Sequence, residues 1–150
     1  MRLILFKIPK RIIYAIEAVL DIALNAGANP VQNITIAKRQ GIPKRYLEQT
    51  LQVLVKNKIL VASRGPRGGY RLAKERRKIK ILDIINSMSN KNESLESHKS
   101  ELSKIIIEPL IEKFMQQCQN NLSKISIEDI YYKYKKINQN KSDKKVDFVI

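Results

Sequence analysis

The chain is poor in the residues that form disulfides, metal sites and aromatic stacking surfaces. Its 150 residues include one cysteine, one histidine and no tryptophan. A single cysteine cannot close an internal disulfide, which is typical of a reducing compartment. The sequence also lacks a glycine-rich phosphate loop followed by Lys-Ser or Lys-Thr, a carboxylate pair for acid–base chemistry, and a Cys–His pair with a third group to orient it. We therefore predict a binding protein rather than an enzyme, with no cofactor and no metal.

Long apolar runs are also missing. No stretch of the sequence approaches the roughly 18 uncharged apolar residues that a membrane span needs. The segment 1–7 has too short an apolar run for a signal peptide, and it has no small-residue cleavage site. These absences predict a cytoplasmic protein with no membrane partner.

Acidic residues are scarce in the first half of the chain. Residues 1–80 carry 18 Lys and Arg against 4 Asp and Glu, whereas residues 81–150 carry 11 against 10. An anionic membrane surface would require a basic amphipathic helix with large apolar residues opposite. The basic residues lie instead on turns, a hairpin and short helices. This pattern favours a nucleic acid as the partner.

The first predicted helix covers residues 12–26 and ends at Gly27 as its C-cap. Beyond its first residues, its only polar side chains are Glu17, Asp21 and Asn25, which are spaced four apart and share one face. We predict that this is the central core helix, with the three polar side chains in a solvent-facing stripe.

Two shorter helices are predicted next, at 33–40 and 43–57, with a break at Gly41. In the first of them, Ile34 and Ala37 are expected to face inward. The inward face of the second follows the i, i+3, i+4, i+7 rule and consists of Leu47, Thr50, Leu51 and Leu54. Two helices joined by such a break form a helix-turn-helix.

A β-hairpin is predicted directly after that second helix. The segment 63–72 contains three of the five glycines and one of the five prolines within five positions, between the apolar runs 59–62 and 70–73. Proline presets φ at a turn and glycine supplies positive φ, so the pattern is typical of a hairpin. The segment also carries three arginines and no acid. A helix-turn-helix followed by a hairpin is a winged helix, in which the hairpin is the wing.

The predicted fold class is mainly α with a small β-hairpin wing, extended by a long C-terminal helix. We expect four regions: a winged-helix domain at 1–88 that closes with a helix at 81–88, a polar linker at 89–100, C-terminal helices at 101–136, and a flexible tail at 137–150.

The long helix is predicted at 101–121, and Pro109 is expected to kink it or to start a new helix. The residues of its apolar stripe are Ile107, Ile111, Phe114, Cys118 and Leu122. A last helix at 127–136 is expected to begin at Ser126 as its N-cap.

The outer face of helix 43–57 carries the groups that we expect to touch DNA. Glu48 can accept a hydrogen bond from cytosine N4 and Gln49 can pair with adenine, while Lys44 and Arg45 would meet phosphate or, for Arg45, guanine. For each residue alone, a solvated helix face is the alternative. An arginine at the wing tip would either enter a narrow minor groove or contact phosphate only. The complete predicted DNA-contacting set is Lys10, Arg11, Lys38, Arg39, Lys44, Arg45, Tyr46, Glu48, Gln49, Gln52, Arg64, Gly65, Arg67, Gly68, Gly69 and Arg71.

The sequence resembles the Rrf family of bacterial winged-helix regulators, which includes the iron–sulfur cluster regulator and the cysteine-metabolism repressor. The likeness covers residues 2–136. The segments that carry it are 36–42, 46–49, 64–66 and 68–72. It implies a homodimer that binds a palindromic operator in double-stranded DNA and is held together by the helix through Phe114. The helices at 101–136 would then be dimerisation helices, and the apolar stripe from Ile107 to Leu122 would lie in the dimer interface. It also implies that Glu48 reads a base and that Arg64 and the wing glycines approach the DNA backbone.

The sequence departs from the family pattern at the wing and at the N-terminus. Arg67 stands where the family usually has a third glycine, which adds charge at the wing tip. The segment 10–14 reads Lys-Arg-Ile-Ile-Tyr where relatives often carry Lys-Gly-Arg-Tyr. Lys10 and Arg11 are expected to substitute for the basic residues of that run.

Many members of the family hold an iron–sulfur cluster with three cysteines before the long helix, and residues 89–108 contain none. We therefore predict a cluster-free member, with Cys118 as a small buried hydrophobe and His98 solvated. Its signal would be an effector protein or a small molecule. The alternative function is a winged helix that binds RNA or the ribosome without operator specificity, because charge alone does not separate RNA from DNA.

Overall fold

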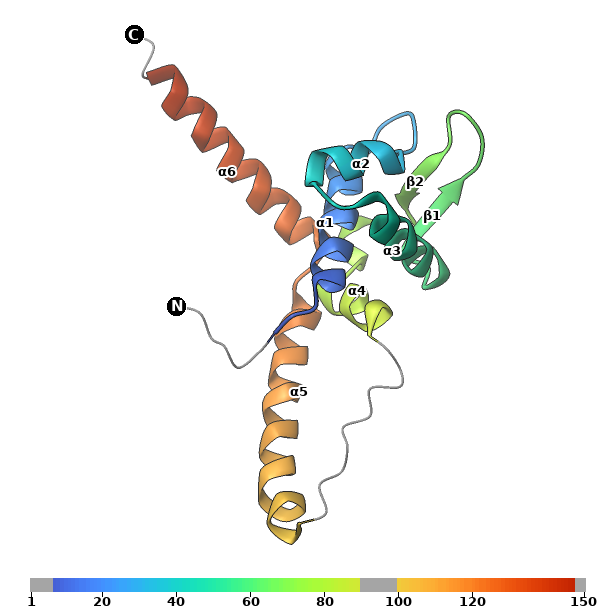
Figure 1. Cartoon of the computed structure of the whole chain (residues 1–150). Helices are drawn as coiled ribbons and strands as arrows, with labels where there is room; N and C mark the ends of the chain where they lie inside the picture. Colours follow the sequence, from blue (N-terminus) through green and yellow to red (C-terminus); the bar gives the residue numbers. More distant parts are fainter. Residues whose placement is uncertain (1–6, 90–99, 148–150) are drawn as a thin grey trace.

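The structure is a computed structural model that describes residues 7–89 and 100–147, so the predicted linker, including His98, lies almost wholly outside the described residues. In chain order the elements are α1 (Lys10–Leu24), α2 (Asn33–Gln40), α3 (Lys44–Lys56), β1 (Leu60–Ser63), β2 (Gly69–Leu72), η1 (Arg76–Lys78), α4 (Ile81–Met88), η2 (Ser103–Ile107), α5 (Glu108–Lys124) and α6 (Ile127–Asp147). Helices α1 to α4 and the hairpin form one body, from which α5 and α6 extend in different directions (Figure 1). The predicted fold, mainly α with a two-stranded wing, is confirmed.

Helix α1 is the centre of the core, as predicted. Its residues Ala15, Ala18 and Val19 are fully buried, and it packs against α2, α3, α4, α6 and β2. Small alanine side chains let the surrounding backbones approach closely. The helix ends at Leu24 rather than at Gly27. Asn25 is its C-cap, and the backbone N–H and the side-chain amide of Asn25 both donate to the Asp21 carbonyl.

The helix-turn-helix forms as the sequence predicts, with the break at Gly41. Gly41 adopts φ 65°, a left-handed conformation that costs glycine little, and Pro43 precedes the first residue of α3. All four predicted inward residues of α3 are buried. On α2, however, the prediction for Ile34 is wrong: its side chain is 50% exposed, and the fully buried residue is Ile36. An eight-residue helix has only two turns, so the partner helices decide which apolar residue it buries.

The wing is an antiparallel pair in which Leu60 lies opposite Leu72 and Ser63 lies opposite Gly69. A third segment continues the ladder, because the backbones of Val31 and Tyr70 exchange two hydrogen bonds of 2.9 and 2.8 Å. Strand β2 is therefore attached, near the tip end of the hairpin, to the loop between α1 and α2, which restricts how far the wing can swing.

Pro109 does not break the long helix. It lies in the first turn of α5, directly after the π-helical turn η2, where the Glu108 N–H donates to the Ser103 carbonyl five residues back. A wider turn accommodates the missing proline N–H, so one continuous helical path covers residues 101–124.

Helix α6 begins after Ser126, as predicted, but it ends at Asp147 rather than near residue 136. Residues 128–147 contain no glycine or proline, so no strong helix breaker interrupts α6. Its first turns pack on the body, where Ile127 is fully buried and the Arg76 guanidinium lies 3.9 Å from the centre of the Tyr131 ring. Among the described helices, none is long and apolar enough to cross a membrane.

Candidate nucleic-acid interface

The outer face of α3 presents five of the predicted DNA-contacting residues together. Spacings of one, three and four residues place them on one side of the helix, opposite the buried face. All five side chains are exposed; they are Lys44, Arg45, Glu48, Gln49 and Gln52. Tyr46 is also exposed, at 58%, but its position along the helix directs it toward α1. Helix α3 therefore offers a protruding ridge of charged and amide groups.

One contact links the two helices of the motif on this face. The side-chain amide of Asn33, the first residue of α2, donates to Glu48 Oε1 at 3.4 Å. A carboxylate keeps further acceptor capacity after one such bond. Glu48 is therefore oriented by α2 and still able to accept a hydrogen bond from a base.

The wing tip presents Arg64 and Arg67, which are exposed and form no ion pair with any described residue. Gly65 adopts φ 100°, and the Gly68 N–H donates to the Gly65 carbonyl, which closes the turn. The Gln32 side-chain amide also donates to the Pro66 carbonyl at 3.4 Å. Both guanidinium groups are therefore available to bind an external anion. The hydrogen bonds to the Gly65 and Pro66 carbonyls hold the turn that presents them.

Arg71, another member of the predicted DNA-contacting set, also forms contacts within the fold. Its guanidinium donates to the carbonyls of Gly27 and Ala28 at 2.8 and 2.5 Å. The residue lies on β2 and reaches back over the loop after α1, so it positions the wing. Sequence reasoning had no signal for this contact, because the partners are backbone carbonyls more than 40 residues away.

Arg39, which is also in the predicted DNA-contacting set, remains partly exposed, but its guanidinium is paired within the fold. Its guanidinium forms two hydrogen bonds with the carboxylate of Asp21, which is buried, and this partner raises the pKa of Arg39. Its neighbour Lys38 is exposed, as predicted. The predicted solvent-facing stripe on α1 is therefore wrong at Asp21, which a cation from α2 covers.

Two of the predicted DNA-contacting glycines have packing roles of their own. A Cβ on Gly69 would lie 2.5 Å from the Val31 carbonyl oxygen, and one on Gly68 would collide with the Ser63 carbonyl oxygen. Both positions exclude a larger residue for reasons inside the fold, whether or not DNA approaches them.

The start of α1 lies on another side of α3. Lys10 is exposed and Arg11 is half-buried. Both line a cavity that also contains Tyr14, Tyr46 and Gln49. The structure therefore brings these two basic residues together with α3 but not with the wing.

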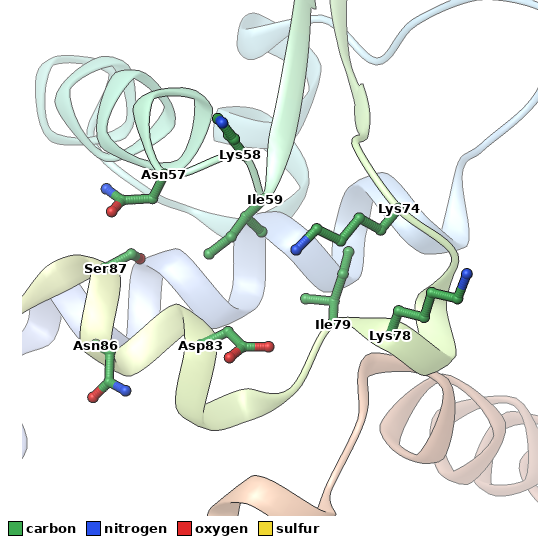
Figure 2. A pocket seen from close by; sticks show the side chains of 9 residues that line it. All are labelled: Asn57, Lys58, Ile59, Lys74, Lys78, Ile79, Asp83, Asn86 and Ser87. Atoms are coloured by element: carbon green, nitrogen blue, oxygen red, sulfur yellow. The ribbon is translucent and has the colours of Figure 1, made fainter.

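A second, smaller cavity of about 240 Å³ lies at the far end of α3. Three lysines and Asp83 line it, but Figure 2 shows that they do not converge: Lys74 points across the opening toward Ile59, whereas Lys58 and Lys78 point away. This cavity is not an assembled anion site.

The predicted dimer stripe on α5 is exposed or half-buried. Ile107, Ile111 and Phe114 are 43–49% exposed, and Cys118 and Leu122 are half-buried. The same helical path exposes further large apolar side chains that the predicted stripe left out: Leu102, Ile105, Ile106, Leu110 and Met115. Their apolar character was visible in the sequence, but they lie around the whole circumference of the helix rather than along one stripe.

Known transcriptional regulators resemble this chain in both sequence and fold. The sequence model of the Rrf2 family, described as an iron-dependent transcriptional regulator, matches residues 8–133. The HTH-type transcriptional regulator IscR of Escherichia coli (strain K12 / DH10B) is 44% identical over 75 residues, or 50% of this chain and 46% of that protein. The chain thus aligns with about half the length of the curated relatives it matches.

Solved structures agree with this placement over most of the chain. T. potens IscR superimposes with a TM-score of 0.72 at 32% identity, over 86% of this chain and 88% of that one. CymR, the global cysteine regulator of B. subtilis, has the same fold, with a TM-score of 0.68 at 24% identity over 85% of this chain and 97% of that one.

The residues of this chain do not fit an iron–sulfur centre. Such clusters are held by several cysteine thiolates, and the whole sequence has one cysteine, which is half-buried on α5. Within residues 7–89 and 100–147, no group of three or more His, Cys, Asp and Glu residues is placed to hold a metal ion.

Proposed function

This chain belongs to the Rrf2 family of transcriptional regulators, and from that premise we propose that it is a homodimeric repressor that reads a palindromic operator in double-stranded DNA. The observation that carries the proposal is the exposed face of α3 beside a wing tip with two unpaired arginines. Both belong to the strongly basic first half of the chain, where phosphate contacts would supply much of the affinity. We expect the protein in the cytoplasm, associated with the nucleoid when bound.

The proposal divides the interface between base reading and phosphate binding. Glu48 and Gln49 reach base edges in the major groove, with Lys44, Arg45 and Gln52 beside them. Arg64 and Arg67 bind at the flanking minor groove or its phosphates, and Lys38 and Lys10 add charge at the edges. Arg39 and Arg71 hold the motif and the wing in place, as their contacts with Asp21 and the loop carbonyls support.

A homodimer would cover the exposed apolar surface of α5. Large apolar side chains from Leu102 to Met115 are 43–66% exposed, and a monomeric protein rarely exposes a contiguous apolar patch of this kind. A second copy related by a two-fold axis would cover this surface and place the two α3 helices about 34 Å apart, one turn of the duplex.

Selection from a random duplex library with the full-length protein tests the operator. We expect a palindrome with half-site centres about 10 base pairs apart. RNA of the selected sequence and a duplex with one half-site scrambled are the controls, and both should bind much more weakly. Equal, sequence-independent binding to RNA and DNA would overturn the proposal in favour of the RNA- or ribosome-associated alternative.

The sign of regulation has a test of its own. When the protein is added, transcription in vitro from a promoter that overlaps the selected site should fall, as expected of a repressor. A rise would identify an activator instead.

Sedimentation of two variants tests the dimer. Ile111→Glu places a charge in the apolar surface of α5, and we expect it to shift the protein toward monomer and to weaken operator binding. Gln116→Glu adds the same charge at a polar position of that helix and should remain dimeric. A dimer that withstands Ile111→Glu would contradict the proposed interface.

A further inference from the structure

A second binding site is formed where the start of α1, the middle of α3 and the end of α4 meet. The cavity there has a volume of about 640 Å³, within the roughly 300–1,000 Å³ typical of small-molecule sites. Eleven residues line it: Lys10, Arg11, Tyr14, Pro43, Tyr46, Gln49, Thr50, Val53, Ser87, Met88 and Ser89. None of them is part of the predicted dimer stripe.

The lining has a distinct chemistry. Five of its residues are apolar or aromatic, and they come from or border all three helices, whereas the two basic residues both come from the first turn of α1. Among the residues that the structure describes, no acidic side chain lines the cavity. The three hydroxyl groups of Thr50, Ser87 and Ser89 already donate to backbone carbonyls of their own helices, at 2.7–2.9 Å. Lys10, the Gln49 amide and the hydroxyls of Tyr14 and Tyr46 remain as groups that can donate to a ligand, and of these only Lys10 is charged.

We propose that this cavity binds a small organic anion, with an apolar or aromatic body against Tyr14, Val53 and Met88 and a carboxylate beside Lys10. The apolar lining excludes a bare inorganic ion, which would lose its hydration without compensation. The excess of positive charge and the absence of carboxylates disfavour a cation. A carboxylate attached to an apolar body of about the size of one ring provides both the apolar surface and the negative charge that this lining favours.

The position of the cavity gives this ligand an effect on DNA binding. Tyr46 and Gln49 line the cavity and also belong to the exposed surface of α3. A ligand that orders these two side chains changes the surface that contacts DNA. By linkage, the operator affinity changes by the same factor by which the ligand's affinity differs between the DNA-free and the DNA-bound protein. This coupling rests on the proposed operator-binding function, whereas occupancy of the cavity does not.

Binding is tested on the full-length protein without DNA, with benzoate as the probe and benzamide as its uncharged counterpart. In amide NMR spectra, benzoate should shift the signals of residues 10–14, 46–53 and 87–89, with an affinity about tenfold above that of benzamide. Lys10→Gln should weaken benzoate binding about fivefold, while Lys7→Gln, an exposed lysine outside the cavity, should leave it unchanged. Shifts centred on the apolar residues of α5, or equal affinity for benzamide, would overturn the proposal.

The coupling is tested by operator titrations with and without saturating benzoate. We expect the dissociation constant for the operator to change about fivefold. An unchanged constant at saturation would overturn the coupling. A protein that binds benzoate in the cavity but selects no operator in the absence of benzoate would count against the proposed function and leave the binding site standing.

Discussion

Asp21 on α1 and Arg39 on α2 form a two-pronged ion pair, with Nε 2.9 Å from Oδ2 and Nη2 2.7 Å from Oδ1. Asp21 is 1% exposed, and the Gln40 side-chain amide donates to the same carboxylate at 2.8 Å. Three donors from the last two residues of α2 thus satisfy one buried charge. This arrangement fixes the first helix of the helix-turn-helix on the core.

Replacement of Arg39 by alanine should destabilise the protein. It leaves the Asp21 carboxylate buried with only one of its three donors, and loss of one partner of a buried ion pair costs about 3–5 kcal/mol. Because the Arg39 side chain is 39% exposed, water can replace part of the lost interaction. We expect a decrease of about 2–3 kcal/mol in the free energy of unfolding, measured by urea denaturation.

The neighbouring lysine supplies the matched control for that change. Lys38→Ala should leave the unfolding free energy within about 0.5 kcal/mol of the parent and should weaken DNA binding, because Lys38 is exposed and contacts no carboxylate among the described residues. If Arg39→Ala were as stable as Lys38→Ala and weakened DNA binding more, Arg39 would be a DNA contact after all.

The same pair shows what local sequence signals can predict. Helix boundaries followed from Gly41 and Pro43, and the exposed face of α3 followed from its apolar spacing, because each signal acts within a few residues. The i, i+4 spacing of Glu17, Asp21 and Asn25 placed them on one face but could not show that α2 covers Asp21. The partner lies 18 residues along the chain, and its approach depends on how the two helices pack.

The wing shows the same division between local and long-range signals. Its turn was predictable from glycine and proline, whereas the contacts of Arg71 with the loop after α1 depend on tertiary packing. The length of α6 differs from the prediction for another reason: the polar, lysine-rich segment 137–147 has too few apolar residues to indicate a helix, but it contains no glycine or proline to interrupt one.

Substitutions of Arg67 and Arg71, two of the three wing arginines, should distinguish a phosphate contact from a residue that positions the wing. Arg67→Ala removes a free guanidinium at the tip, so operator affinity should fall and the slope of log K against log salt should decrease by about 0.9. Arg71→Ala releases the wing from the Gly27 and Ala28 carbonyls. Affinity should fall in this variant too, but the salt slope should stay near the parent value. Anisotropy titrations at several salt concentrations measure both quantities, and identical slopes for the two variants would contradict the distinction.

Gly69→Ala should destabilise the fold independently of DNA. The added Cβ would lie 2.5 Å from the Val31 carbonyl oxygen, so the wing and the loop must move apart and lose the Val31–Tyr70 backbone pair. Such overpacking typically costs about 1–3 kcal/mol. Gly27→Ala is the matched control, since nothing lies within 4 Å of its Cβ position. Thermal unfolding of both variants without DNA would measure the difference, and equal melting temperatures would show that the loop adapts freely.

The start of α6 should make stability depend on pH. Asp129 Oδ2 accepts hydrogen bonds from the Ser126 backbone N–H at 2.8 Å and from the Ser126 hydroxyl at 2.9 Å. These bonds favour the ionised carboxylate and hold the pKa of Asp129 below its usual value, the backbone bond contributing most. A carboxyl group whose pKa is lower in the folded state stabilises the fold above its unfolded-state pKa. That stabilisation is lost as the pH falls through the folded-state pKa.

Comparison of the parent protein with Asp129→Asn tests this dependence. At neutral pH the variant should unfold more easily, because an amide oxygen is a weaker acceptor than a carboxylate and the residue no longer favours the helix N-terminus by its charge. The difference should shrink as the pH is lowered, since the parent side chain then becomes neutral as well. Asp143→Asn, near the other end of α6, controls for the loss of one negative charge. A stability difference between the parent and Asp129→Asn that stays constant from neutral to strongly acidic pH would show that the Ser126–Asp129 bonds do not depend on ionisation of the carboxylate.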